Sequence, residues 1–253
     1  MPDLIVVPTF NESGNILALL ERLRSVVPDA HVLVVDDNSP DGTGVLVQSC
    51  QERDAAIHLL ERTAKDGLGR AYVTGFAWGL ARGYDRIVQM DADFSHAPED
   101  VVRLLAASDN ADLVLGSRYV PGGGTRNWGA GRRFLSKGGS WYARTLLGLP
   151  IRDLTGGFKC WRREALVAIE LEGVRSNGYS FQIEMTWRAV RRDLRVAEVP
   201  IVFTDRVDGV SKMSKRIVLE AMTMVWRLRM STWPRSTELT AGSAEPPTRT
   251  NRG

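Results

Sequence analysis

The sequence contains few cysteines and no long apolar run. Cys50 and Cys160 are its only cysteines, and neither belongs to a CxxC pair or to a His/Cys spacing typical of metal sites. No stretch reaches the roughly 18 apolar residues that a membrane-spanning helix needs. Residues 1–8 lack the basic region and long apolar core of a signal peptide. We therefore expect a cytoplasmic protein with reduced thiols that does not cross a membrane by itself.

The chain also has little net charge. The 33 basic and 30 acidic side chains give a formal net charge of +3, which does not indicate nucleic-acid binding by the whole chain. Positive charge is instead local, and a local cluster suits an anionic ligand or an anionic membrane, although a solvated helix face has the same composition. The two clusters consist of Arg126, Arg132, Arg133, Lys137 and Arg144, and of Lys212, Lys215 and Arg216.

The first half of the chain alternates short apolar runs, typical of buried strands, with helical patterns. Strands are predicted at 4–7, 31–35, 57–60, 86–90 and 112–116. Helices are predicted after a Ser13 cap, after the turn at 38–42, and over 68–81 and 98–107. Strands that alternate with helices of about 10–15 residues indicate parallel βαβ units. The fold class is therefore α/β, with ligands expected beyond the carboxyl ends of the strands.

The second half has a less regular pattern. The glycine-rich stretch 121–131 predicts a loop, and a basic helix follows it. Beyond the segment 153–161, a helix is predicted at 179–191, a strand at 196–203 and a helix at 217–230. We expect one domain over 1–230 and a disordered tail at 231–253, because the tail lacks periodicity and is rich in Pro, Ser, Thr and Gly.

Paired acids end two of the predicted strands. Asp36 and Asp37 end one of them, and Asp91 and Asp93 end another at the same edge. Residues two apart in an extended segment project to the same side, so Asp91 and Asp93 are expected to converge. Two hard oxygen ligands with open positions suit Mg²⁺ or Mn²⁺. The plainer interpretation is that these acids lie in solvated turns.

Two other α/β classes fit the pattern poorly. The segment VLVVDDN is similar to the opening of a receiver domain, but a complete strand and helix precede it and the chain continues far beyond receiver length. A dinucleotide-binding oxidoreductase should carry its glycine-rich turn after the first strand. Here residues 9–12 (TFNE) occupy that place.

Eight motifs in order resemble those of family 2 glycosyltransferases, and among them the dolichol- or polyprenol-phosphate mannosyltransferases. They are VVPTFNESGNI (6–16), VVDDNSPDGT (34–43), DGLGRAY (66–72), MDADFSHAPED (90–100), GSRYVPGGG (116–124), DLTGGFKCWRREAL (153–166), GYSFQIEM (178–185) and EVPIVFTDRVDGVSKM (198–213). The resemblance implies a GT-A fold, with a nucleotide-binding half at about 1–117 and an acceptor-binding half at about 118–230. It also implies transfer of mannose from GDP-mannose to a polyprenyl phosphate with Mg²⁺ or Mn²⁺.

The resemblance further implies which residues form the site. The nucleotide-binding residues that it implies are Pro8, Phe10, Glu12, Val35, Asp37, Asp66 and Ala92. The family often has Tyr where Phe10 stands, so a hydroxyl contact is lost. The implied metal ligands are Asp91, Asp93 and Ser95, although the family often has Gln at the last position. The implied acceptor-phosphate residues are Arg118, Arg132 and Ser136. Arg206 and Lys212 match a loop that closes on the nucleotide phosphates, and the resemblance implies that these two residues act in catalysis together with Asp91 and Asp93.

Charge also suggests the mechanism. A divalent cation held by Asp91 and Asp93 would offset the negative charge of the departing nucleotide, and Arg206 and Lys212 are expected to add positive charge there. A phosphate monoester has a second pKa near 6 and is largely ionised at pH 7, so we expect no catalytic base. Attack opposite the nucleotide predicts inversion. Glu184 is expected to be structural or orienting, and His96 to cap a helix or lie on the surface. Trp128 is expected to pack in the core, with the lining of a lipid channel as the alternative.

Alternatives remain for the donor and for the class of protein. A polyprenyl-phosphate glucosyltransferase that uses UDP-glucose performs the same chemistry, and a non-catalytic nucleotide-binding scaffold would need no intact acidic pair. A processive polysaccharide synthase is disfavoured because its QxxRW signature is absent. We expect the protein to meet its lipid at the cytoplasmic face of a membrane, through amphipathic helices or a separate membrane-anchoring protein.

Overall fold

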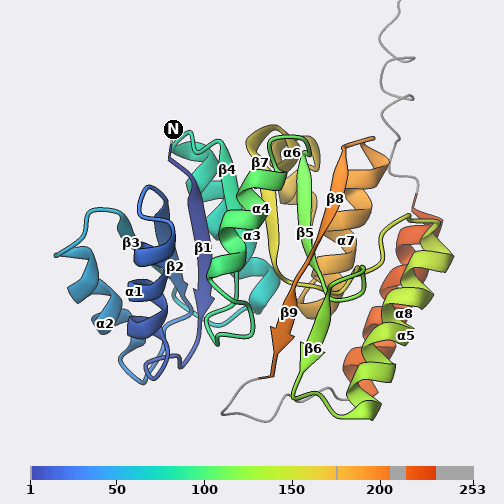
Figure 1. Cartoon of the computed structure of the whole chain (residues 1–253), viewed down its shortest axis with the longest axis horizontal. Helices are drawn as coiled ribbons and strands as arrows, with labels where there is room; N and C mark the ends of the chain where they lie inside the picture. The colour runs from blue at the N-terminus through green and yellow to red at the C-terminus, as the bar shows by residue number, and fades with distance from the viewer. Residues whose placement is uncertain (1, 175, 206–214, 232–253) are drawn as a thin grey trace, which may run out of the picture.

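A computed structural model of the chain describes residues 2–174, 176–205 and 215–231, with the backbone alone for 215–221. Its centre is a sheet with the strand order β3-β2-β1-β4-β7-β5-β8 (Figure 1). The strands are β1 (Leu4–Thr9), β2 (His31–Asp36), β3 (Ile57–Glu61), β4 (Arg86–Gln89), β5 (Leu113–Ser117), β7 (Lys159–Arg162) and β8 (Val196–Pro200). All neighbouring strands are parallel except β7, which is antiparallel to both β4 and β5. The mostly parallel α/β class is confirmed.

Helices cover both faces of this sheet. They are α1 (Ile16–Val26), α2 (Thr43–Gln51), α3 (Leu68–Ala81), α4 (Glu99–Ala107), α5 (Ala130–Leu147), α6 (Arg163–Ala168), the 3₁₀ turn η1 (Leu171–Gly173), α7 (Gly178–Arg191) and α8 (Lys215–Met230). Alternate residues of β1 show the two layers. Leu4 and Val6 pack in a core with α3 and α7, whereas Ile5 and Val7 pack in a second core with α1 and α4. Because both faces of the sheet are buried, the sequence of β1 is a continuous apolar run without polar alternation.

The structure corrects three local predictions. Asn15, and not Ser13, occupies the position before α1, and the Ser13 amide donates to the Asp41 carboxylate instead. The glycine-rich stretch contains the short strand β6 (Gly124–Arg126), which pairs with β9 (Val202–Thr204) in a second sheet. The single strand predicted at 196–203 is therefore two strands. Residues 196–200 form β8 and pair with β5 in the central sheet, whereas residues 202–204 form β9 and pair with β6.

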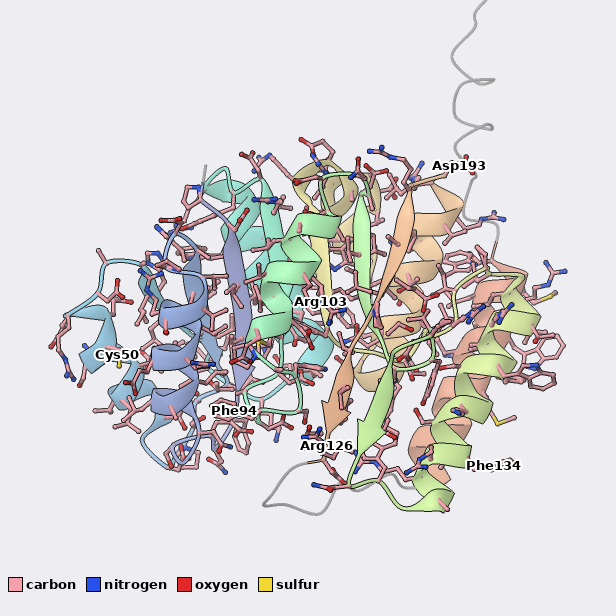
Figure 2. All side chains as sticks on the ribbon, in the orientation of Figure 1. Cys50, Phe94, Arg103, Arg126, Phe134 and Asp193 are labelled. Atoms are coloured by element: carbon pink, nitrogen blue, oxygen red, sulfur yellow. The ribbon has the colours of Figure 1, made fainter. Side chains whose placement is uncertain are left out.

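The carboxyl ends of the parallel strands meet at one edge, the lower edge in Figure 1, where Figure 2 labels Phe94 and Arg126. The antiparallel strand β7 begins at this edge, since Lys159 pairs with Gln89 at the end of β4. The loop before β7 therefore lies beside the loops that follow β4 and β5. Segments far apart in the sequence meet at this edge.

Candidate active site

The two acids at the end of β2 have different environments. Asp36 is structural, because its carboxylate accepts hydrogen bonds from the Thr9 hydroxyl (2.7 Å) and the Ser39 hydroxyl (2.6 Å). Asp37 instead accepts from Nη1 of Arg62 at 2.6 Å. Burial raises the pKa of Asp37, and the Arg62 charge opposes that shift. Asp37 is therefore the acid of this pair that is available to a ligand.

A cavity of about 260 Å³, called here the Asp37 cavity, lies at the ends of β1, β2 and β4. It brings together five of the seven residues predicted to bind the nucleotide. Its lining consists of Pro8, Thr9, Phe10, Glu12, Asp37, Lys65, Leu68, Ala71, Asp91, Ala92 and Asp93. The Lys65 ammonium lies 3.6 Å from the centroid of the Phe10 ring, a cation–π contact on the wall of the cavity.

Val35 and Asp66 are the two predicted nucleotide-binding residues that do not line this cavity. Val35 is a fully buried core residue of β2. Asp66 is exposed and lies 3.4 Å from Arg62, the residue that also holds Asp37. Asp66 is thus linked to the cavity through Arg62.

A second cavity of about 390 Å³, called here the Arg118 cavity, lies at the ends of β4 and β5. Its lining consists of Leu68, Asp91, Asp93, Ser95, His96, Arg118, Trp128, Arg132, Thr155, Gly157, Asn177, Gly178, Tyr179, Ser180, Gln182 and Phe203. Asp91 and Asp93 line both cavities. The acidic pair therefore lies where the two cavities meet.

Each of these aspartates is held by a donor on one carboxylate oxygen. Oδ1 of Asp91 accepts from the Tyr72 hydroxyl at 2.9 Å, and Oδ1 of Asp93 accepts from the Ser95 amide at 3.0 Å. Tyr72 is fully buried, and burial together with the Asp91 charge raises the pKa of its hydroxyl. Tyr72 therefore stays protonated and remains a donor to Asp91.

The donor set of the acidic pair fits a hard divalent cation. The described residues contain no group of three or more His, Cys, Asp and Glu side chains that could hold a metal, and the oxygen ligands that they offer at this point are the carboxylates of Asp91 and Asp93 with the nearby Ser95 hydroxyl. Mg²⁺ and Mn²⁺ are commonly bound in this way, with substrate phosphates and water completing the coordination. A closed four-ligand zinc site does not fit these residues.

His96 lies in the interior, which contradicts its prediction as a cap or surface residue. It is 2% exposed, stacks on Phe158 with a centroid distance of 4.8 Å, and meets the edge of Phe203 at 5.3 Å. Pro98 occupies the position before α4. Burial lowers the pKa of His96, so the ring is neutral and forms part of the wall of the Arg118 cavity.

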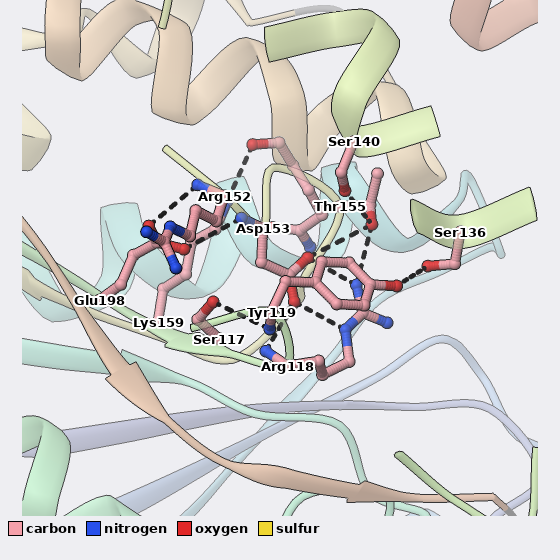
Figure 3. Close-up of polar contacts among 11 residues, drawn as sticks. Ser117, Arg118, Tyr119, Ser136, Ser140, Arg152, Asp153, Thr155, Lys159 and Glu198 are labelled. Carbon is pink, nitrogen blue, oxygen red and sulfur yellow. Dashed lines mark hydrogen bonds and ion pairs between the residues drawn. The ribbon is translucent and has the colours of Figure 1, made fainter. Parts of the chain in front are cut away.

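The two predicted acceptor arginines are both paired with carboxylates. Arg118 forms a two-point ion pair with Asp153, in which Nε and Nη2 each lie 2.7 Å from a carboxylate oxygen (Figure 3). Arg132 donates through Nη1 to both oxygens of Asp205 at 2.6 Å. The Arg118 pair is buried and the Arg132 pair is partly exposed.

Trp128 connects these arginines, although the sequence predicted a core residue. Its ring centroid lies 4.4 Å from the Arg132 guanidinium and 5.4 Å from that of Arg118. Trp128 is 7% exposed, as a core residue would be, but it lines the Arg118 cavity. Ser136 is buried beside this cavity without lining it, and its hydroxyl accepts from Tyr119 at 2.6 Å.

Arg206 and Lys212 lie outside the described residues, so the predicted phosphate loop is not part of this geometry. Glu184 is buried and ion-paired with Arg188 at 2.8 Å, and it accepts a hydrogen bond from the Ser176 hydroxyl. Arg188 in turn donates to the carbonyls of residues 169, 170 and 173. Glu184 therefore has a structural and orienting part in the loop beside the Arg118 cavity.

Tyr72 and Asp153 were not among the predicted site residues. Both occur inside motifs that carried the resemblance, DGLGRAY and DLTGGFK, but their partners are 19 and 35 residues away in sequence. No local spacing signals such a pairing.

Residues 4–169 match the family described as Glycosyl transferase family 2. The chain belongs to this family. The match includes Asp37, Asp91, Asp93, Arg118 and Asp153, which are central to the two cavities. The chain is therefore a glycosyltransferase.

Three relatives have more specific names. Polyprenol monophosphomannose synthase of Mycolicibacterium smegmatis is 51% identical over 230 residues, which cover 89% of this chain and 87% of the relative. Undecaprenyl-phosphate mannosyltransferase of Micrococcus luteus is 51% identical over 227 residues, which cover 90% and 93%. Dolichol-phosphate mannosyltransferase of Pyrococcus furiosus is 34% identical over 231 residues, which cover 88% of this chain and 62% of the relative.

The solved structure of glucosyl-3-phosphoglycerate synthase from Mycobacterium tuberculosis, in complex with Mn²⁺, UDP and glucosyl-3-phosphoglycerate, has the same fold. The TM-score is 0.67 at 17% identity, and the match covers 90% of this chain and 80% of that one. At this identity the likeness establishes the fold alone. The GT-A fold expected from the motifs is confirmed.

Proposed function

We propose that this protein transfers mannose from GDP-mannose to a polyprenyl phosphate and forms a polyprenyl-phosphate mannose. The observation that carries the proposal is the position of Asp91 and Asp93 between the Asp37 cavity and the Arg118 cavity. The first cavity has a carboxylate for a base or ribose, and the second has arginines for a phosphate. The names of the three relatives, each a mannosyltransferase or a phosphomannose synthase, support mannose and a polyprenyl acceptor.

The proposed metal ion is Mg²⁺ or Mn²⁺, held by Asp91 and Asp93 with Ser95 nearby. When bound, the ion would offset the negative charge that develops on the departing nucleotide. The protein's own contribution is to fix the carboxylates, through Tyr72 for Asp91 and through the Ser95 amide for Asp93. Arg206 and Lys212 are proposed to add positive charge at the same phosphates.

The acceptor side needs cations and no base. A phosphate monoester is already largely ionised at pH 7, so its oxygen attacks without transferring a proton to the protein. Arg118 and Arg132 would orient it, since a guanidinium fork matches phosphate oxygens. An acceptor in the Arg118 cavity with the nucleotide in the Asp37 cavity would attack the sugar from the side opposite the nucleotide, and this arrangement supports the proposal of inversion at the sugar carbon.

A membrane surface is proposed as the place of reaction. Among the described residues, no helix has the length and apolar content to span a bilayer. The helices α5 and α8 pack side by side at one end of the molecule (Figure 1). In the described part of these helices the exposed large apolar side chains are Phe134, Leu135, Trp141, Met222, Trp226 and Met230, and the exposed basic side chains include Arg133, Lys137, Arg144, Arg227 and Arg229.

This combination of apolar and basic side chains suits an interface with anionic lipids. Phe134 is 82% exposed and lies at the end of α5 near the edge that carries the two cavities (Figure 2). We propose that α5 and α8 lie on the cytoplasmic face of the membrane, alone or with a separate anchoring protein.

The test is a donor-by-acceptor assay with purified protein, labelled GDP-mannose or UDP-glucose, a polyprenyl phosphate, and Mg²⁺ or Mn²⁺. Labelled lipid is expected from GDP-mannose, and its anomeric configuration is read by NMR. Labelled lipid from UDP-glucose but not from GDP-mannose would refute GDP-mannose as the donor. The absence of lipid-linked sugar with both donors, with a known enzyme active in parallel, would refute the proposed reaction.

A further inference from the structure

The two arginines of the Arg118 cavity differ in how they are paired. The Arg118–Asp153 pair is almost fully enclosed, with side chains 5% and 0% exposed. The Arg132–Asp205 pair is open to solvent, with side chains 24% and 26% exposed. A buried ion pair cannot lose one partner without leaving an uncompensated charge, whereas a partly exposed pair contributes little and can be exchanged.

Asp153 uses one edge of the Arg118 guanidinium and leaves the other accessible. Nε donates to Oδ2 of Asp153, and Nη2 donates to Oδ1 of Asp153 and to the Thr155 hydroxyl at 2.8 Å. These bonds occupy three of the five N–H groups that an arginine side chain carries. Among the described residues, Nη1 has no hydrogen-bond partner, and it is not one of the buried unpaired atoms. Arg118 lines the cavity, and Nη1 is the guanidinium nitrogen that these bonds leave for a ligand.

The position of Asp153 is itself fixed from the sheet. Glu198, on β8, accepts hydrogen bonds from the amides of Arg152 (2.9 Å) and Asp153 (3.0 Å), as Figure 3 shows. The Arg118 amide also donates to Oδ2 of Asp153 at 2.9 Å. The backbone of residues 152–153 is therefore held by β8, and the Asp153 carboxylate is held by the Arg118 amide at the end of β5.

We propose that Asp153 is a positioning residue that holds Arg118 with Nη1 toward an anionic oxygen of the acceptor, and that Asp205 occupies Arg132 as an exchangeable substitute for the acceptor phosphate. This inference rests on the proposed function, in which the two arginines bind that phosphate. Asp153 acts through Arg118 and touches no reacting atom, whereas Asp205 competes directly with the acceptor for Arg132.

The matched variants Asp153→Asn and Asp205→Asn separate positioning from simple electrostatics. Each removes one negative charge beside the cavity, so a general field effect would tighten acceptor binding in both. We expect opposite results. Asp205→Asn lowers the acceptor KM by up to about 5-fold, because a weak exposed pair no longer competes. Asp153→Asn raises it by about 10–100-fold, because Arg118 loses its charged hydrogen-bond partner. The KM for the sugar nucleotide stays unchanged in both variants.

A second variant keeps the test decisive if Asp153→Asn does not fold, which thermal unfolding by circular dichroism would show. Glu198→Gln removes one of the two acceptors that anchor the loop, leaves no buried charge, and lies outside the lining of the cavity. We expect it to raise the acceptor KM by a few-fold, on the order of one lost hydrogen bond, at unchanged donor KM. A folded Glu198→Gln variant with the wild-type acceptor KM would overturn the positioning proposal.

Direct binding separates this inference from the proposed function. A short-chain polyprenyl phosphate in detergent micelles is titrated calorimetrically into each variant without donor or turnover. If the wild-type protein makes no lipid-linked sugar yet the Asn variants shift phosphate-lipid affinity in opposite directions, the proposed reaction fails and the positioning inference holds. Shifts in the same direction, or no binding to the wild-type protein, would overturn the inference whatever the activity.

Discussion

Replacement of Tyr72 by phenylalanine tests the acidic pair without altering its charge. The Tyr72 ring is fully buried between Phe76 and Phe181, at centroid distances of 5.8 and 6.0 Å, so phenylalanine keeps the packing. The change removes only the hydroxyl, which donates to Oδ1 of Asp91 at 2.9 Å. Asp91 then loses a hydrogen-bond donor that helps to orient its carboxylate.

The expected magnitude follows from that one hydrogen bond. A hydrogen bond to a charged group contributes about 1.5–3 kcal/mol, and loss of a partner that orients a metal ligand lowers metal affinity by about 10–100-fold. We therefore expect the Mn²⁺ concentration for half-maximal activity to rise by about 10–100-fold, with much of the rate recovered at saturating metal.

The assay measures initial rates against Mn²⁺ concentration at fixed donor and acceptor. Tyr84→Phe is the matched control, because Tyr84 is also buried but its hydroxyl contacts His31 at 2.6 Å, at the opposite end of the sheet. Its metal dependence should equal that of the wild-type protein. An unchanged Mn²⁺ requirement in folded Tyr72→Phe would refute the claim that Tyr72 orients a metal-binding Asp91.

Three further predictions concern different parts of the molecule. Asp91→Ala and Asp93→Ala should each lower turnover at least about 100-fold while thermal unfolding stays cooperative, and wild-type rates in both would contradict the metal assignment. Burial lowers the pKa of His31 and of its neighbour His58, so the unfolded state binds more protons below about pH 6.5 and the free energy of unfolding should fall as the pH drops through that value. In urea unfolding between pH 7 and 5.5, His58→Gln should lose less of its free energy of unfolding than the wild-type protein does. An equal loss in the two proteins would contradict this reasoning. Phe134→Ser and Trp141→Ser should each weaken binding to anionic vesicles in a flotation assay by about 10-fold or more, since burial of a large apolar side chain contributes about 1.5–3 kcal/mol. The control Val45→Ser, on α2 at the opposite end of the molecule, should bind as the wild-type protein does. Equal binding of all three variants would refute the assignment of α5 and α8 as the membrane-binding surface.

The regular part of the fold follows from the sequence. The first five strands and four helices were predicted within a few residues, and α3 has the predicted bounds Leu68–Ala81. Here the apolar runs and helical periodicity agree with the tertiary structure. The edge that carries Asp37, Asp91 and Asp93 follows from the parallel strand order, because carboxyl ends of parallel strands meet at one edge.

The features that the sequence did not predict depend on distant partners. Strand β7 contains Lys159, whose ammonium is fully buried and donates to the Gln182 carbonyl at 2.8 Å. Burial lowers the pKa of Lys159 to about 7. A lysine argues locally against a central strand, and nothing in this short segment encodes an antiparallel direction.

The candidate site shows the same division. Arg118 and Arg132 were identified as residues for an anion, but their pairing with Asp153 and Asp205 spans 35 and 73 residues. His96 was expected to cap a helix or lie on the surface because it comes just before Pro98, a residue typical of a helix start. In the structure it packs against Phe158 and Phe203. Local chemistry thus identified the charged groups, whereas their orientation came from the packing of the second half of the chain.

The most direct test of the central claim is a crystal structure with GDP-mannose and Mn²⁺, with the metal located by anomalous scattering. The account predicts an anomalous peak at coordination distance from the carboxylates of Asp91 and Asp93, with the guanosine in the Asp37 cavity and the mannose directed toward the Arg118 cavity. A metal bound away from both aspartates, or a nucleotide in the Arg118 cavity, would contradict it.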